Sequence, residues 1–285
     1  MKKFFRYALL IALCSFLFAG CGGEEKKASD DAGKIKLGMI TRLNASEENF
    51  SEFMKQIEET FNLKLSSHTP VFFDSLNAMQ MALQAKQIDE ISTYRSVARY
   101  MIAQNPRFEV LKDHSLEFID SFCFALREDD AKLRDSLNMV IKEMQEDGTL
   151  DRLTKEYITD INAETAPPAV ELPHFDGADT IKVAVTGDLP PLDFISADGK
   201  PAGFNTAVLE EISVRMLKNI ELVEIEGGAR AAALTSNQVD VVFWAIVPVS
   251  EIIPSDSDKP EGVILSDPYY KDKVVHMIFK PEEKK

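Results

Sequence analysis

Residues 180–194 read TIKVAVTGDLPPLDF, which is an apolar run followed by a Gly-Asp turn and a double proline. The apolar run predicts a buried strand, and glycine and proline are typical of the loop that follows a strand. The stretch comes after a proline-bearing segment, APPAVELPHFDG at 166–177, which has the composition of a linker. A domain is therefore expected to begin near residue 180, past the middle of a chain of 285 residues.

Strand and helix patterns alternate on both sides of this linker. After it we expect a strand at 181–185 and a loop at 186–194. A helix capped by Asn205 or Thr206 should follow at 205–216, then a strand at 221–225, a short helix at 227–237 and a strand at 239–247. Before it we expect strands at 34–40, 69–73, 88–93, 108–111 and 121–126, with helices capped by Ser46 and Ser75 and another at 96–103. A helix striped by Leu133 to Met144 should then end at Gly148, with Thr149 as the N-cap of the next.

The two halves repeat short motifs at the same spacing. Ala82-Leu83 followed by Gln87-Ile88-Asp89 matches Ala233-Leu234 followed by Gln238-Val239-Asp240. Helices between strands predict parallel pairing, and the carboxyl ends of such strands face the crevice where ligands bind. Any α/β unit shows some of this pattern, but the fixed spacing favours two related α/β units.

The amino terminus has the features of a secretory signal. Lys2, Lys3 and Arg6 precede an apolar run that is too short to span a membrane, and Phe18-Ala19-Gly20-Cys21 resembles a bacterial lipobox. We expect a lipoprotein signal peptide at 1–20, lipid on Cys21 and a flexible tether at 21–33; the alternative is an ordinary signal peptide followed by a free cysteine. The formal net charge of −15 argues against nucleic acid as a partner. Beyond residue 21 the chain holds one cysteine, Cys123, in an apolar alternation typical of a core.

Longer motifs resemble the family 3 solute-binding proteins, the extracytoplasmic receptors of polar amino acid ABC transporters. VAVTGDLPPLDFISADGKPAGFN at 183–205, LTSNQVDVVFW at 234–244 and SDPYY at 266–270 resemble the first lobe of that family. ALQAKQIDEI at 82–91 and FALREDDAKLRDSLNMVIKEMQEDGTLDRLTKEY at 124–157 resemble its second lobe, return strand and terminal helices. The resemblance implies an α/β, two-lobed, type 2 periplasmic-binding-protein-like (Venus flytrap) fold.

The order of these parts is reversed relative to the family, which suggests a circular permutation. Residues 34–158 would form the second-lobe-like half with the return strand and terminal helices, 159–179 the linker, and 180–285 the first-lobe-like half with the crossing hinge strand. The alternative is a pair of truncated binding domains. Permutation predicts that Val274–Phe279 pairs with Ser121–Leu126, and that Lys34 lies near Lys280.

The resemblance implies a substrate-binding lipoprotein of an ABC importer that closes on a small polar solute, an amino acid or a related organic acid. Its partners would be that ligand, a membrane permease, and the membrane through the lipid on Cys21. The alternatives are a ligand-sensing receptor subunit and a dehydratase-type enzyme on the same fold. No catalytic residue, cofactor or metal is expected, because His68, His114, His174 and His276 are scattered without metal-ligand spacing.

Ligand contacts should come from loops at the carboxyl ends of strands, which gives the candidates Asp188, Phe194, Arg230, Trp244, Arg42, Asn44, Tyr94 and Arg95. Phe194 and Trp244 would serve equally as core residues, Asp188 as a turn cap, and the three arginines as surface charges. Two clamps of the amino-acid receptors are missing. The stretch 248–262, PVSEIIPSDSDKPEG, lacks the arginine that holds the ligand carboxylate, and 92–98, STYRSVA, lacks the acid that meets the ammonium. Arg42, Arg95 or Arg230 would instead hold an anionic ligand.

Overall fold

The computed structural model describes residues 34–44, 55, 58–59, 68–111, 118–162, 167–249 and 255–281. The expected signal peptide, the tether, Cys21 and the helix capped by Ser46 lie outside the described residues. None of the helices within those ranges is long and apolar enough to cross a membrane. Residues from Ile35 onward belong to one compact unit, and the description below concerns that unit.

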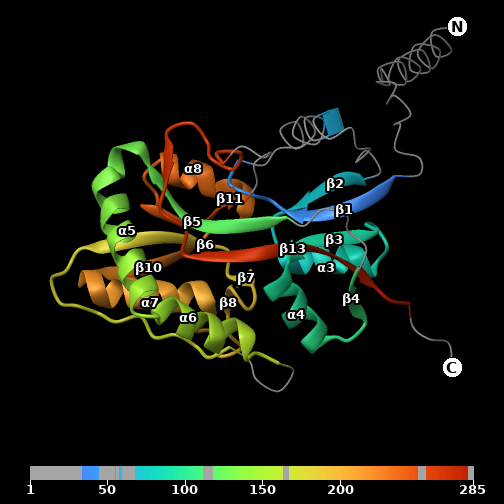
Figure 1. The fold of residues 1–285 in the computed structure, drawn as a ribbon, viewed down its shortest axis with the longest axis horizontal. Helices are drawn as coiled ribbons and strands as arrows, with labels where there is room; N and C mark the ends of the chain where they lie inside the picture. The colour runs from blue at the N-terminus through green and yellow to red at the C-terminus, as the bar shows by residue number, and fades with distance from the viewer. Residues whose placement is uncertain are drawn as a thin grey trace, which may run out of the picture. The chain divides into compact units, whose positions relative to one another are not determined.

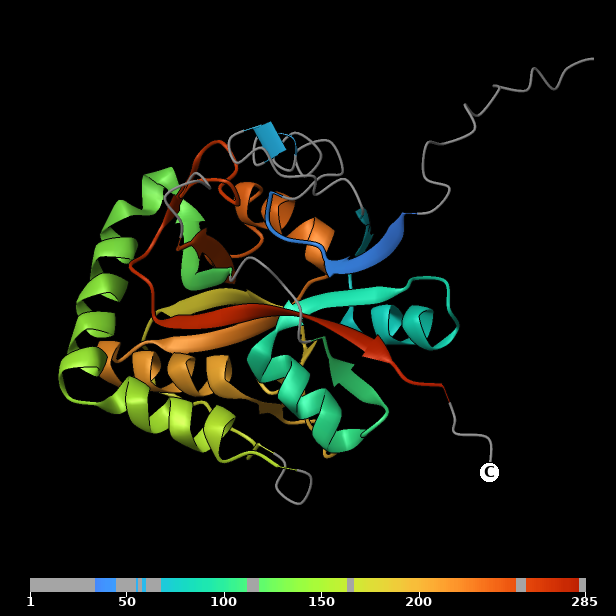
Figure 2. The ribbon, with the colours of Figure 1, turned by 45° about the vertical axis from the view of Figure 1, so that its right-hand side comes forward.

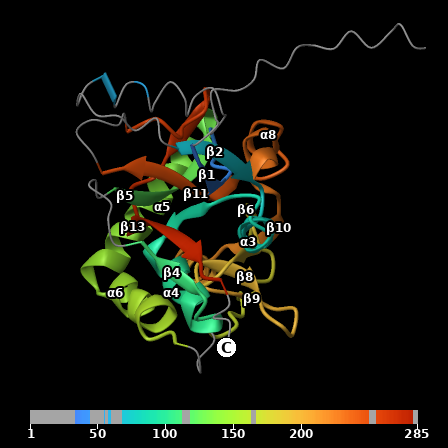
Figure 3. The same cartoon turned by 90° about the vertical axis from the view of Figure 1, so that its right-hand side faces the viewer.

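A long mixed sheet runs through this unit and divides into two lobes (Figure 1). We call lobe A the part with strand order β2-β1-β3-β13-β4 and helices α3 and α4. Its elements are β1 (Ile35–Ile40), β2 (His68–Phe73), α3 (Leu76–Gln84), β3 (Glu90–Tyr94), α4 (Arg95–Gln104), β4 (Phe108–Val110) and β13 (Tyr270–Phe279). Strands β1, β2 and β3 pair in parallel, as the intervening helix patterns predict. Figure 3 looks at the molecule from the side of lobe A, with α4 beside β4.

Lobe B is the part with strand order β10-β6-β11-β5, with β12 also on β5. Its strands are β5 (Ile119–Arg127), β6 (Thr180–Val185), β10 (Asn219–Glu224), β11 (Val241–Pro248) and β12 (Val263–Leu265). Its helices are α5 (Ala131–Glu146), α6 (Thr149–Thr154), α7 (Phe204–Met216) and α8 (Arg230–Thr235), with single turns at Glu128–Asp130, Lys155–Thr159 and Gly227–Ala229. Three short strands, β7 (Asp188–Leu189), β8 (Asp193–Ile195) and β9 (Pro201–Ala202), form a separate small sheet in the stretch expected to be a loop and turn.

Each lobe receives one strand from the other end of the chain. Strand β5 follows the lobe A strands but lies in lobe B, and β13 follows the lobe B strands but pairs with β3 and β4 in lobe A. Figure 2 shows β13, in red, passing from one lobe to the other. The predicted hinge pairing is correct in its two strands but wrong in its register. Only Tyr270–Lys273 pairs with Ile119–Phe122, because the next residues of β13 have already joined β3.

The repeated motif forms the same structure in both lobes. Asp89 follows α3 and its carboxylate accepts from Lys36 N at 2.8 Å, while its own N–H donates to Lys36 O at 2.9 Å. Asp240 follows α8 and makes the same pair with Lys182, at 2.9 and 2.8 Å. An aspartate thus fixes the start of the first strand against the start of the third in each lobe, so the two halves repeat one α/β unit.

Helix starts agree with the sequence in one case and differ in two. Ser75 caps α3 by accepting from Ala78 N at 3.2 Å, as predicted. The prediction that Asn205 or Thr206 caps α7 is wrong, because the helix begins earlier, with Gly203 as its N-cap at a φ of 105°. Thr149 is not an N-cap either: Gly148, in the left-handed conformation, takes that place, and Asp147 Oδ1 accepts from Thr149 N at 2.9 Å.

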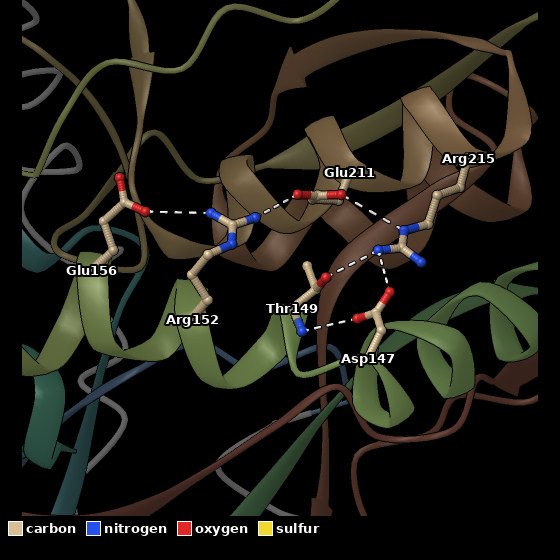
Figure 4. A network of polar contacts seen from close by, with 6 residues as sticks. All are labelled: Asp147, Thr149, Arg152, Glu156, Glu211 and Arg215. Carbon is tan, nitrogen blue, oxygen red and sulfur yellow. Dashed lines mark hydrogen bonds and ion pairs between the residues drawn. The ribbon is translucent and has the colours of Figure 1, made fainter.

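Helices α5 and α6 pack on lobe B through a polar network with α7 (Figure 4). Arg215 of α7 contacts Asp147 at 2.8 Å and Thr149 Oγ1 at 3.0 Å. Arg152 of α6 contacts Glu211 of α7 at 2.6 Å. Below the network the predicted stripe on α5 is buried, and Cys123 is 1% exposed, as expected for a core residue. Burial raises the pKa of Cys123 to about 12, so its thiol is unreactive at neutral pH.

Candidate functional site

A cavity lies between the lobes, where β1 and β3 of lobe A end and the hinge strand β13 passes. Its lining residues are Met39, Ile40, Arg42, Ser92, Thr93, Tyr94, Leu189, Trp244 and Val274. Seven of these come from lobe A and its hinge strand, and two come from lobe B. The carboxyl ends of parallel strands are the usual place for a ligand in sheets of this kind, so this cavity is the candidate site.

Asp120 holds two of the lining side chains together. Its carboxylate accepts from Tyr94 Oη at 3.0 Å and lies 3.4 Å from Arg42 Nη2. The side chain of Asp120 is 4% exposed and that of Arg42 is 26% exposed. Burial and the negative charge of Asp120 raise the pKa of Tyr94. Burial acts to lower the pKa of Arg42. The electrostatic interactions of Arg42 with Tyr94 and Asp120 outweigh that effect and raise its pKa, so the guanidinium stays charged.

Arg230 lies behind Trp244 and is entirely buried. Its guanidinium carbon sits 5.1 Å from the centre of the Trp244 ring, a cation–π distance. Nη2 donates to Thr41 O of lobe A at 3.1 Å, and Nε donates to Gly227 O at 3.4 Å. Burial lowers the pKa of Arg230, and nearby acids, Asp258 first among them, oppose that change. Two buried N–H groups, Arg230 Nη1 and Trp244 Nε1, have no hydrogen-bond acceptor among the residues that the structure describes.

The Gly227-Gly228 pair explains how Arg230 reaches lobe A. A Cβ on Gly227 would stand 3.0 Å from Thr41 O, closer than side-chain carbons usually approach a backbone oxygen. The missing side chain lets the turn before α8 lie against the end of β1. Gly228 N then donates to Asp74 Oδ1 of lobe A at 3.0 Å, so two glycines and an arginine form one contact between the lobes.

Two further acids join the lobes around the cavity. Asp258 of lobe B accepts from Asn44 N at 2.9 Å and from Ile246 N at 3.1 Å. Burial raises the pKa of Asp258 to about 6, against the opposing effects of Arg42 and these N–H donors. Asp188 of β7 accepts from Asn77 N at 3.4 Å, and burial raises its pKa too. Both carboxylates lie in lobe B, and each accepts from one N–H of lobe A, that of Asn44 or that of Asn77.

The structure brings together some of the eight predicted residues. Arg42, Tyr94 and Trp244 line the cavity. Arg230 lies directly behind Trp244, and Asn44 and Asp188 make contacts between the lobes. The half-buried Phe194 packs on Tyr100 at 6.3 Å between ring centres. Arg95 is exposed at the start of α4, and neither it nor Phe194 lines the cavity.

Sequence reasoning missed Asp120 and Asp258. Asp120 stands beside the apolar run SFCFAL, and its importance depends on the pairing of β5 with the hinge strand. Asp258 lies in the stretch 248–262, which lacks an arginine, and nothing in the sequence of that stretch predicts a buried acid. Asp193 accepts from Thr186 N, Thr186 Oγ1 and Gly187 N, each at 2.8 Å, and fixes a turn.

The chain was compared with curated proteins, with solved structures and with protein-family models. No curated protein sequence matches the chain. Among solved structures, the ligand-binding component of an ABC-type import system from Staphylococcus aureus, with zinc bound, is similar, with a TM-score of 0.38 and 13% identity. That match covers 86% of this chain but 65% of the other, less than two thirds of its length. A putative L-cystine ABC transporter from Listeria monocytogenes gives a TM-score of 0.39 and 12% identity over 87% of this chain and 84% of the other.

A nutrient-binding protein from Burkholderia cenocepacia, bound to methionine, gives a TM-score of 0.38 and 11% identity over 86% of this chain and 84% of the other. Likenesses this distant say nothing of the ligand. The family comparison is more specific, because it matches the half that carries the motifs VAVTGDLPPLDF and SDPYY. Residues 181–283 match the model of the bacterial extracellular solute-binding proteins, family 3, which confirms the family resemblance for this half of the chain.

Proposed function

We propose that this chain is the extracytoplasmic substrate-binding lipoprotein of an ABC importer, and that it binds a small polar solute in the cavity between its lobes. The family match of residues 181–283 supports the class of function. The position of the cavity, at strand carboxyl ends and against the hinge strand, supports the place of binding. Binding rather than catalysis is proposed, since the residues around the cavity serve as donors and as contacts between lobes.

The observation that carries this proposal is a pair of unsatisfied N–H groups, one on Trp244, which lines the cavity, and one on Arg230, which packs against Trp244. Leaving a buried donor without an acceptor costs about 1–3 kcal/mol, and more for a charged group. Arg230 Nη1 and Trp244 Nε1 both lack an acceptor in the described part of the chain. Arg42 adds a permanent positive charge to the cavity wall. A carboxylate or another small oxyanion would satisfy these donors, so we propose an organic anion as the ligand.

Closure would be a rotation of the lobes about β5 and β13, the two strands that connect them. Rigid rotation about a few hinge residues is the usual motion of proteins that bind between two lobes. Opening would break the contacts of Asn44 with Asp258 and of Gly228 with Asp74, all of them single hydrogen bonds. Each is worth about 0.5–3 kcal/mol, so a handful of them can be opened and remade during binding.

We also propose the circular permutation, the lipid anchor on Cys21 and a membrane permease as partner. The sheet register supports the permutation: β1 and β13 flank β3, one parallel and one antiparallel to it. Ile35 and Phe279 therefore belong to the same end of the sheet, about 10 Å apart at two strand spacings. Chain ends that lie close together are those that tolerate rejoining elsewhere.

A thermal-shift screen of amino acids, dipeptides and organic acids tests the proposal. A ligand in excess over its Kd raises the melting temperature by mass action, by about 2.7 kcal/mol of stability at one hundred times Kd. The ligand found should then be titrated into Arg42→Ala, Arg230→Ala and, as matched control, Arg95→Ala. We expect the first two to weaken binding at least about tenfold, since a charged hydrogen bond contributes about 1.5–3 kcal/mol. Unchanged affinity in both would contradict the proposed site.

A further inference from the structure

Three side chains that are far apart in the sequence meet on lobe A. His68 opens β2, Glu90 opens β3, and His276 lies on β13. Glu90 Oε2 is 3.0 Å from His276 Nδ1 and 3.7 Å from His68 Nε2. The two imidazole rings lie edge to face, with centroids 5.7 Å apart. One potential ligand atom from each of the three lies within 4.8 Å of the others.

The sheet topology explains why these residues converge. Strand β1 pairs Ile35 with His68 on one side and Leu37 with Glu90 on the other, and β13 pairs His276 with Ser92. Residues two apart on a strand share a face, so His68, Glu90 and His276 all point to one face of the sheet. The expectation of scattered histidines is therefore wrong for these two, because their proximity comes from strand order and not from sequence spacing.

We propose that His68, Glu90 and His276 bind a divalent transition-metal ion of the Zn²⁺ class. Two imidazole nitrogens and one carboxylate oxygen are a common ligand set for Zn²⁺, and three protein ligands leave one position open for water. Tetrahedral ligands at the usual Zn²⁺ distances stand about 3.3 Å from one another. The two observed distances to Glu90, 3.0 and 3.7 Å, lie on either side of that value.

Exposure and charge favour an ion at this place. The side chains of His68, Glu90 and His276 are 24%, 12% and 19% exposed, so an ion could reach them and would still be partly desolvated. The formal net charge of −15 raises the local concentration of cations. Without metal, Glu90 accepts a hydrogen bond from His276 at 3.0 Å and lies 3.7 Å from His68, and this polar cluster is the alternative that the experiment must separate from a metal site.

The ion would tie together strands that are remote in the chain. His276 belongs to β13, the last strand that the structure describes, whereas His68 and Glu90 belong to β2 and β3. A bound ion would therefore fasten the last strand to lobe A and raise the stability of that lobe. The site is distinct from the proposed ligand cavity, because none of its three residues lines that cavity.

Isothermal titration of the metal-stripped protein with Zn²⁺ tests the proposal. Millimolar Mg²⁺ in the buffer occupies exposed acidic groups, which bind hard cations without selecting Zn²⁺. We expect one Zn²⁺ per chain at this site, a rise in melting temperature on binding, and a four-coordinate visible spectrum when Co²⁺ replaces Zn²⁺. His68→Gln, Glu90→Gln and His276→Gln should each raise the Zn²⁺ Kd at least about tenfold. Mutating a residue that only hydrogen-bonds to a metal ligand already lowers metal affinity about 10–100-fold, and these three residues would be the ligands themselves.

His174→Gln is the matched control, because His174 is an exposed histidine with an acid, Asp176, 3.5 Å away. It should bind Zn²⁺ as the wild type does. Far-UV circular dichroism and the metal-free melting temperature check that each variant is folded, and His68→Gln, at the first residue of its strand, is the least disruptive. Zn²⁺ affinity that is unchanged in all three cluster variants, or lost equally in His174→Gln, would overturn the site. Failure here would leave the cavity ligand of the thermal-shift screen unaffected, so the two proposals can fail separately.

Discussion

Asp120 is the acid that holds Arg42 and Tyr94 in place beside the cavity, so Asp120→Ala should destabilise the protein measurably. Tyr94 Oη would lose its acceptor in a buried position, which costs about 1–3 kcal/mol. Arg42 would lose a carboxylate 3.4 Å away, but its side chain is 26% exposed and solvent screens the loss to about 1 kcal/mol. The sum is about 3 kcal/mol, which lowers the melting temperature of a chain of this size by about 6–12 °C.

Urea unfolding of single and double variants measures both contributions. In double-mutant cycles with Tyr94→Phe and Arg42→Met, the coupling of Asp120 to Tyr94 should exceed its coupling to Arg42. The matched control is Asp135→Ala, because Asp135 pairs with Arg134 at 2.6 Å on the surface, where the side chains are 67% and 30% exposed. That shorter but exposed pair should contribute less than about 0.5 kcal/mol. The reasoning is refuted if Asp120→Ala costs less than Asp135→Ala.

Three further predictions concern the backbone and two acids. Gly203→Ala should cost more than about 3 kcal/mol in urea unfolding, because φ is 105° and a Cβ would stand 2.6 Å from Leu192 O, whereas Gly199→Ala, with nothing within 4 Å, should cost about 1 kcal/mol. Burial raises the pKa of Asp258 to about 6, above its unfolded value, so its contribution to stability is present below pH 4 and lost as the pH rises through 6. The wild type should therefore lose more unfolding free energy between pH 4 and pH 8 than Asp258→Asn does. Hydrogen bonds from Thr149 and then Arg215 lower the pKa of Asp147 to about 2. The contribution of Asp147 to the free energy of unfolding is therefore present above pH 4 and lost towards pH 2. An NMR titration of Thr149→Val should show a higher pKa for Asp147 than in the wild type.

Local patterns were enough to predict the repeated α/β units. Apolar runs predict the strands, and Ser75 is recognised as an N-cap, because strand formation and helix capping depend on a few neighbouring residues. The aspartates of the repeated motif, Asp89 and Asp240, could be aligned from spacing alone, and they form the same hydrogen bonds in space. The sequence predicts a later start for α7 than the structure has, because a glycine with positive φ can end a turn and cap a helix at the same time.

The pairing of the distant strands β5 and β13 could be predicted, but the details of how distant segments meet could not. The register of β13 depends on its competing partners β3 and β5, and no residue in the strand specifies where one pairing gives way to the other. Asp258 meets Asn44 across 214 positions, and His276 meets Glu90 across 186. Arg230 resembles a surface residue in sequence, and only the approach of the Gly227 turn to Thr41 shows that it is buried.

The charges around the cavity suggest how an anion would bind without the family's arginine clamp. Arg42 and Arg230 carry positive charges near the cavity, and Asp120, Asp188 and Asp258 are acids beside them, so an incoming anion meets acids as well as arginines. An incoming carboxylate adds a negative charge and is favoured when one acid takes up a proton. Asp258 is the acid that can do so at moderate pH, because burial raises its pKa to about 6.

Affinity for the anion should therefore increase as the pH falls from 8 towards 5, by at most about tenfold per pH unit for a single coupled proton. The measurement is isothermal titration of the ligand from the thermal-shift screen at several pH values, with proton uptake read from buffers of different ionisation enthalpy. Asp258→Asn, which fixes the group in a neutral form, should bind more tightly at pH 8 and lose this dependence. An affinity that does not change with pH, or the same pH dependence of affinity in Asp258→Asn, would mean that Asp258 does not face the ligand. The proposal of an anionic solute would then rest on the charges of Arg42 and Arg230 alone.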